Sequence, residues 1–117
     1  MPAQIRIQLA AQAEGDLQAI YNHRLNQRGA DGTDGADALL DTLYDTIAGL
    51  AEFPLRGPIP PELDALGIAD WRQVSVWPYR IIYTLEGDLL TIAVVADSRR
   101  DFASLLERRL LQRSSRT

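Results

Sequence analysis

The chain has 117 residues, of which 46% are hydrophobic and none is cysteine, and its formal net charge at pH 7 is −4. A chain of this length buries about 65% of its unfolded surface, which is enough for one core. The lack of cysteine excludes disulfides and thiolate metal sites. The longest apolar run, Leu89–Ala96, is too short to cross a bilayer, which takes about 20 residues. Because no signal-peptide pattern opens the chain, we predict a cytoplasmic domain over residues 1–113 and a disordered tail at residues 114–117.

Charge is distributed unevenly along the chain. Residues 1–70 hold four Arg against eleven Asp and Glu, whereas residues 71–117 hold eight Arg against five acidic residues. The negative total argues against a general nucleic-acid binder. All twelve basic residues are Arg, which excludes any mechanism that depends on a lysine base or Schiff base.

The first half of the chain predicts a strand followed by two helices. Apolar and polar residues alternate over Gln4–Leu9, the pattern of a half-buried strand. The period becomes helical over Ala11–Arg28. After a glycine-rich turn, where Thr33 or Asp34 is expected to act as the N-cap, a second amphipathic helix is predicted from Gly35 to Glu52. The two helices should form an antiparallel hairpin.

The second half predicts a proline-rich connector, three strands and a last helix. The connector covers Leu55–Asp70 and contains one helical turn at Glu62–Leu66. Three strands follow, at Trp71–Trp77, Tyr79–Leu85 and Leu89–Asp97. Asp101 is then expected to cap a short C-terminal helix. The predicted fold class is α+β in the order β-α-α-β-β-β-α, with the helical hairpin on one face of a mainly antiparallel four-stranded sheet.

The last two strands predict a sheet with two different faces. If they turn at residues 87–88, Tyr83 pairs with Ile92 and Ile81 pairs with Val94. This large apolar face should pack on the helical hairpin. The opposite face carries Arg80, Ile82, Thr84, Thr91, Ala93, Val95 and Asp97. Because helices are expected on one side only, we expect this smaller, more polar face to remain open.

The open face predicts a groove with Arg80 on its floor and Arg99 and Arg100 at its rim. Arginine presents a planar fork of donors that suits phosphate or carboxylate. The groove would therefore meet a polyanion or an acidic surface. The alternative is that Arg80 forms a structural salt bridge with Asp97 and that the Arg99–Arg100 pair is solvated.

Other residue types offer less chemistry. No cluster has the spacing of a metal site, and no phosphate-binding loop follows a strand, so we expect no metal or cofactor. His23, the only histidine, is expected on the helix surface, and Glu62 and Asp64 are expected to be solvated. Trp71 and Trp77 flank one strand and either pack locally or contact a partner. No complete set of acid, base and nucleophile is present.

Four segments resemble the RelE/ParE toxin superfamily, and more closely its ParE branch. They are Leu50–Gly57, Pro78–Tyr83, Ser98–Asp101 and Leu105–Leu111. The similarity covers nearly the whole chain, and the predicted element order also matches. The resemblance implies the toxin of a type II toxin–antitoxin (plasmid stabilization) system, neutralised by a small antitoxin. Members of the RelE branch cleave mRNA on the ribosome, and members of the ParE branch poison DNA gyrase.

The resemblance also implies roles for particular residues. Arg80 and Arg100 correspond to catalytic positions of RNA-cleaving relatives. The paired lysines of those nucleases fall near Trp71–Val74, where only Arg72 is basic, and their aromatic hydroxyl falls near Leu106. General acid–base help is worth roughly 10² to 10⁴ in rate. We therefore expect a gyrase inhibitor, with an mRNA endoribonuclease or a non-toxic antitoxin-binding module as the alternatives.

We expect five residues to contact the target: Arg72, Trp77, Arg80, Arg99 and Arg100. The expected partners are the cognate antitoxin and DNA gyrase, or ribosome-bound mRNA under the nuclease alternative. The antitoxin should lay a helix or strand along the hairpin or the sheet edge. A homodimer or a toxin–antitoxin hetero-oligomer is compatible with the sequence, and no membrane partner is expected.

Overall fold

The predicted order of elements is confirmed in the computed structural model, which describes residues 4–114. The elements are β1 (Arg6–Leu9), α1 (Ala11–Arg28), α2 (Ala36–Gly49), α3 (Pro61–Asp64), β2 (Trp71–Val76), β3 (Tyr79–Glu86), β4 (Leu89–Asp97) and α4 (Phe102–Ser114). The short α3 is the helical turn predicted in the connector. Of the predicted tail, only Ser114 falls within the described residues.

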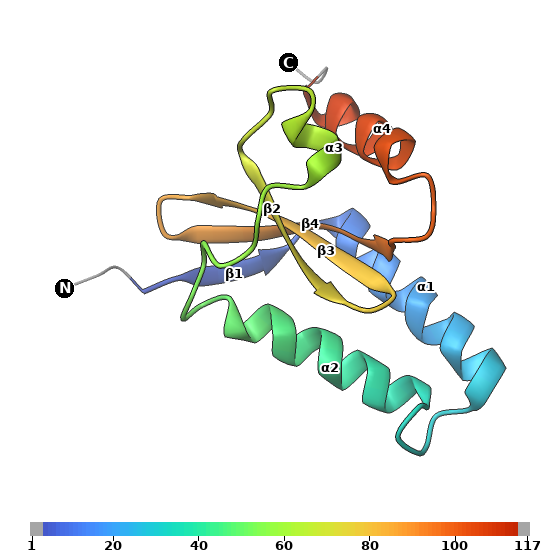
Figure 1. The fold of residues 1–117 in the computed structure, drawn as a ribbon. Coiled ribbons are helices and arrows are strands. Elements are labelled where there is room, and N and C mark those ends of the chain that lie inside the picture. The colour runs from blue at the N-terminus through green and yellow to red at the C-terminus, as the bar shows by residue number, and fades with distance from the viewer. Residues whose placement is uncertain (1–3, 115–117) are drawn as a thin grey trace.

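The four strands form one sheet in the order β1-β4-β3-β2 (Figure 1). β1 runs parallel to β4, and the other two pairs are antiparallel, so the mainly antiparallel sheet is confirmed. α1 and α2 cover one face, as predicted, because their apolar stripes need a partner. The buried residues at the centre of this layer are Leu17, Leu43, Ile47, Leu50, Ile81, Tyr83, Leu90 and Ile92.

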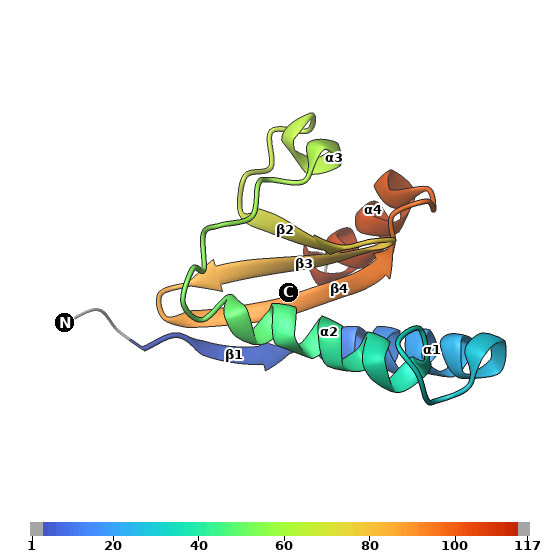
Figure 2. The same ribbon diagram turned by 60° about the horizontal axis from the view of Figure 1, so that its bottom comes forward.

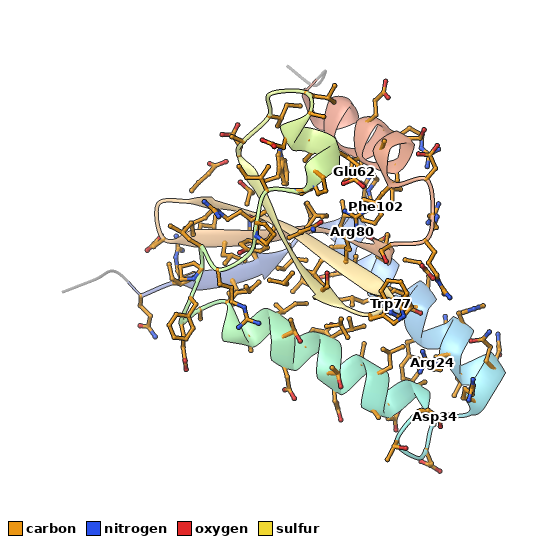
Figure 3. The ribbon with its side chains drawn as sticks, in the orientation of Figure 1. Arg24, Asp34, Glu62, Trp77, Arg80 and Phe102 are labelled. Carbon is orange, nitrogen blue, oxygen red and sulfur yellow. The ribbon has the colours of Figure 1, made fainter. Side chains whose placement is uncertain are left out.

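The turn between α1 and α2 differs from the prediction. Gly35 is the N-cap of α2, and no side chain caps the helix, so neither Thr33 nor Asp34 has the predicted role. The carboxylate of Asp34 instead accepts a hydrogen bond from Arg28 at 2.7 Å, and its carbonyl accepts one from Arg24 at 3.0 Å (Figure 3). A Cβ at Gly35 would overlap the backbone carbonyls of the preceding turn, so only glycine fits there.

The second face of the sheet is covered by α3 and α4, which corrects the open face predicted from the sequence. Figure 2 shows α1 and α2 on one side of the sheet and α3 and α4 on the other. The buried residues of this second layer are Leu63, Ile82, Ala93, Val94, Ala96, Phe102, Leu105 and Leu106. The apolar side of the last helix therefore packs on the sheet and removes the predicted groove.

The pairing of β3 with β4 contains one irregularity that sequence alternation does not reveal. Tyr83 pairs with Ile92 as predicted, whereas Ile81 pairs with Val95 rather than Val94. A β-bulge immediately before Tyr83 shifts the register by one residue. Because a bulge exchanges the faces of the residues beyond it, Val95 packs on the helical hairpin and Val94 packs under α4.

A charged pair connects α1, β4 and α4 where β1 no longer covers β4. β1 pairs with β4 only as far as Ile92. Beyond it, the backbone N–H of Val95 donates to the Asp16 carboxylate at 3.0 Å. The guanidinium of Arg109 binds the same carboxylate at 2.8 and 3.2 Å and the carbonyl of Ala93 at 3.2 Å. These bonds satisfy backbone groups of an otherwise open strand edge.

Candidate functional site

Arg80 on β3 points between α3 and α4, where Figure 3 shows it beside Glu62 and Phe102. Its two terminal nitrogens donate to the two Glu62 carboxylate oxygens at 2.9 and 2.7 Å, and one of them also donates to the Gln73 side chain at 2.8 Å. The guanidinium carbon lies 3.8 Å from the Phe102 ring centroid. Only 12% of the Arg80 side chain is exposed. The cation is therefore part of an internal contact network.

The interaction between Glu62 and Arg80 is an ion pair as well as a pair of hydrogen bonds. The hydrogen bonds from Arg80 lower the pKa of Glu62 below its ordinary value, against the opposing effect of burial. The Glu62 carboxylate is therefore ionised near neutral pH. The sequence-based alternative, a salt bridge between Arg80 and Asp97, is wrong in its partner, because Asp97 binds Arg99. The predicted solvation of Glu62 is also wrong.

Arg72 on β2 is engaged with the connector. Its guanidinium donates to the backbone carbonyl of Gly57 at 2.8 Å and to that of Leu55 at 3.2 Å. The backbone N–H of the neighbouring Gln73 donates to the Pro58 carbonyl at 2.9 Å. These bonds hold residues 55–58 along β2. The contacts of Arg72 are therefore structural ones.

Arg99 and Arg100 follow β4 and differ in their partners. Arg99 forms a two-pronged ion pair with Asp97 at 2.9 and 2.6 Å, and its side chain is 65% exposed. Hydrogen bonding from Arg99 lowers the pKa of Asp97, and the charge of Arg100 adds a smaller effect in the same direction. Arg100 is exposed, and its side chain makes no hydrogen bond or ion pair with residues 4–109, whose side chains the structure describes.

Trp77 lies at the same end of the sheet as these two arginines. It occupies the turn between β2 and β3 and is 76% exposed. The carbonyl of the next residue, Pro78, accepts hydrogen bonds from the backbone N–H of Ser98 at 2.7 Å and from its hydroxyl at 2.8 Å. The two loops are therefore joined. We refer to Trp77, Arg99 and Arg100 as the sheet-end surface.

The five predicted contact residues therefore divide into two groups. Trp77, Arg99 and Arg100 remain together on the surface, whereas Arg72 and Arg80 point inward to internal partners. The prediction missed Glu62, and its only sequence signal is its position in the first turn of a proline-initiated helix beside the buried Leu63. It also missed the Asp16–Arg109 pair, whose members are 93 residues apart.

A separate groove of about 420 Å³ runs along the helical hairpin and the end of β1. Its lining includes Leu9, Glu14, Leu17, Tyr21, Leu40 and Tyr44. Tyr44 is 45% exposed, and Tyr21 donates a hydrogen bond to Asp37 at 2.6 Å, which raises the pKa of the Tyr21 hydroxyl. The groove is thus apolar at its base and acidic at its border.

Two absences concern the described part of the chain. Residues 4–114 contain no group of three or more His, Cys, Asp or Glu side chains placed to hold a metal ion. None of the helices there has the length and apolar character that a membrane crossing requires.

Residues 7–102 match the family described as the ParE toxin of the type II toxin–antitoxin system parDE. The chain belongs to the ParE toxin family. This match covers most of the chain, including the hairpin, all of the sheet except Arg6, and the loop with Arg99 and Arg100. The resemblance inferred from the sequence motifs is confirmed, and the chain is a ParE-type toxin of a type II toxin–antitoxin system.

Solved structures share the ParE-type fold at low sequence identity. One is the chromosomal ParDE toxin–antitoxin system from P. aeruginosa, with a TM-score of 0.65 and 18% identity over 80% of this chain and 96% of that one. Another is the toxin–antitoxin complex RelBE2 from Mycobacterium tuberculosis, with a TM-score of 0.55 and 17% identity over 81% and 99% of the two chains. No curated protein sequence matches the chain significantly.

Proposed function

We propose that this ParE-type toxin acts in the cytoplasm, inhibits growth by poisoning DNA gyrase and is neutralised by a cognate antitoxin. The observation that supports this choice of target is that Arg80 is engaged in internal contacts, which argues against an RNA-cleaving toxin. In a nuclease that arginine would have to reach a phosphate. Here both of its terminal nitrogens bind Glu62, and Phe102 covers the guanidinium.

Other positions of the nuclease pattern support the same choice. Arg72, the basic residue nearest the expected lysines, binds backbone carbonyls of the connector. Leu106 is fully buried where an aromatic hydroxyl would be expected. Without a positioned acid and base, cleavage of a phosphodiester loses roughly 10² to 10⁴ in rate. A target that is bound rather than cleaved fits these side chains better.

The groove on the helical hairpin is our candidate antitoxin site. Leu9, Leu17 and Leu40 offer an apolar base for a helix or strand, and Glu14 offers an anion at the border. Residues 1–70 contain seven more acidic than basic residues. An amphipathic antitoxin segment with apolar anchors and a Lys or Arg beside them would complement this surface.

The proposal for the target is tested with purified toxin and purified gyrase. We expect loss of supercoiling activity together with trapped double-strand DNA cleavage, and relief of both when the antitoxin is added. Unchanged supercoiling with codon-positioned mRNA cuts in a translating extract would establish the nuclease alternative instead. Normal growth of cells that express the chain alone would identify a non-toxic antitoxin-binding module.

The proposed antitoxin site has its own test. Tyr44→Ala should weaken antitoxin binding about tenfold, since exposed aromatic side chains commonly carry binding energy in such grooves. Because Tyr44 lies at the surface, the variant should fold normally and still arrest growth. Phe53→Ala, another exposed aromatic that does not line the groove, serves as the control. Equal antitoxin affinity of the two variants would exclude the groove.

A further inference from the structure

The sheet-end surface contains an exposed aromatic side chain, Trp77, and a cation, Arg100, whose side chain has no partner among residues 4–109. Trp77 is 76% exposed, the largest exposed fraction among the large hydrophobic residues described. The side chain of Arg100 makes no hydrogen bond or ion pair with residues 4–109, while the adjacent Arg99 is paired with Asp97. Of the three residues of the sheet-end surface, only Arg99 therefore has a side-chain contact with a structural role in the described part of the chain.

The two loops that carry these residues are fixed relative to each other. Ser98 lies between β4 and the arginines, and both its N–H and its hydroxyl donate to the Pro78 carbonyl, next to Trp77. The Asp97 carboxylate also accepts from the backbone N–H of Arg99 at 2.9 Å. A surface that is ordered before binding loses less conformational entropy on association.

The charge of this surface favours a protein partner over a nucleic acid. Residues 97–101 contain two Arg and two Asp, so their charges cancel. Asp101 is turned toward α4, where it binds Ser104, which leaves Arg100 as the cation available to a partner. Nucleic-acid binders typically use several phosphate contacts. One unpaired guanidinium at the same end of the sheet as an exposed indole instead matches the composition of protein–protein hot spots.

We propose that Trp77 and Arg100 form the contact through which this toxin holds its protein target. The partner surface would offer a carboxylate to Arg100 beside an apolar side chain for the indole. This inference rests on the proposed function and narrows the five predicted contact residues to two. The sheet-end residues do not line the groove on the hairpin, so the target and the antitoxin segment would occupy different faces.

The experiment compares Trp77→Ala and Arg100→Ala with two exposed controls, Phe53→Ala and Arg6→Ala. Phe53 is 62% exposed, and Arg6 is 69% exposed in a surface pair with Asp88. Growth arrest, inhibition of supercoiling by purified DNA gyrase, neutralisation by the antitoxin and thermal unfolding are measured for each. We expect each sheet-end variant to need at least about tenfold more toxin for half-inhibition. The controls should stay within about twofold of the wild type, with all variants still neutralised.

The results distinguish a failure of the proposed contact at Trp77 and Arg100 from a failure of the proposed gyrase target. If the sheet-end variants inhibit as strongly as the controls, or lose antitoxin binding instead of toxicity, the inference is wrong. If the wild type arrests growth without affecting gyrase, the gyrase assignment fails, and growth arrest by the variants still decides the role of the surface. If the wild type cuts mRNA and the variants reduce that cutting, the partner is a nucleic acid and the inference is overturned. A wild type that neither slows growth nor inhibits gyrase would refute both.

Discussion

The guanidinium carbon of Arg80 lies 3.8 Å from the centroid of the Phe102 ring, so a strand residue and the first residue of α4 are in direct contact. Glu62 of α3 binds the same guanidinium from another side. Arg80 thereby connects α3 and α4 across the second face of the sheet. The resemblance to RNA-cleaving relatives implies a catalytic position for Arg80, but its surroundings here are those of a structural residue.

Replacing Arg80 with Ala should destabilise the fold. The change removes the contact with Phe102 and leaves the half-buried Glu62 carboxylate without its cation. Breaking a fully buried pair costs about 3–5 kcal/mol. Because Arg80 and Glu62 retain 12% and 23% exposure, we expect a loss of about 2 kcal/mol in the free energy of unfolding, measured by urea denaturation.

Arg99→Ala is the matched control for this prediction. Arg99 makes a similar two-pronged pair with Asp97, but its side chain is 65% exposed. Exposed pairs contribute about 1 kcal/mol or less. Equal losses for Arg80→Ala and Arg99→Ala would contradict the structural role assigned to Arg80.

Acid should destabilise the protein partly through Glu62. Hydrogen bonds from Arg80 hold the pKa of Glu62 below its ordinary value of 4.5 in the folded chain. A group with a lowered folded pKa stabilises the fold fully above its unfolded pKa and loses that contribution as the pH falls through the folded pKa. The free energy of unfolding should therefore fall between about pH 5 and pH 3, and it should fall less in Glu62→Gln.

Some acid dependence should remain in that variant. Hydrogen bonds from Arg99 lower the pKa of Asp97, and those from Ser104 lower the pKa of Asp101. The control is Glu52→Gln, which changes an exposed carboxylate and should keep the wild-type profile. Identical acid profiles for Glu62→Gln and Glu52→Gln would show that Glu62 does not contribute.

Local patterns were sufficient to predict the elements. The predicted bounds of the first helix, Ala11–Arg28, and of the last strand, Leu89–Asp97, agree with the structure. The predicted cap of the last helix is also confirmed, since Asp101 accepts from the backbone N–H of Ser104 at 3.2 Å. Each of these features depends on residues within a few positions of one another.

The candidate site depends on long-range contacts and was only partly predictable. Arg80 and Glu62 are 18 residues apart, and no local period relates them. A bulge that no residue type in the sequence indicates interrupts the alternation along β4. Val94 and Val95 therefore lie on the faces opposite to those predicted. The exposed position of Arg100 was predictable because a loop directly after a strand end tends to lie at the surface.

Asp16→Ala should destabilise the fold by about 2–3 kcal/mol, less than a fully buried pair would. The change leaves Arg109 without its carboxylate and removes the acceptor of the Val95 N–H. The side chains of Asp16 and Arg109 are only 19% and 17% exposed. Arg6→Ala is the control, since it breaks a surface pair and should cost less than about 1 kcal/mol.

A double-mutant cycle tests whether Asp16 and Arg109 act as a pair. Arg109 Nε is buried without a hydrogen-bond partner, so the interior does not fully satisfy this guanidinium. The combination Asp16→Ala with Arg109→Met should therefore be more stable than the sum of the single losses implies, because no charge is left uncompensated. Strict additivity in urea denaturation would show that the two residues contribute independently.

Two glycine substitutions should change stability in opposite directions. A Cβ at Gly57 would overlap the backbone carbonyl of Gln73 and crowd the Tyr83 hydroxyl, which accepts a hydrogen bond from the Gly57 N–H at 3.2 Å. Gly57→Ala should therefore cost about 2 kcal/mol or more. Gly15 lies within α1 with nothing near its Cβ position, so Gly15→Ala should stabilise the helix by about 0.5–1 kcal/mol. Thermal unfolding should show a lower midpoint for Gly57→Ala and a higher one for Gly15→Ala. An unchanged or raised midpoint for Gly57→Ala would mean that the connector is not packed tightly against β2.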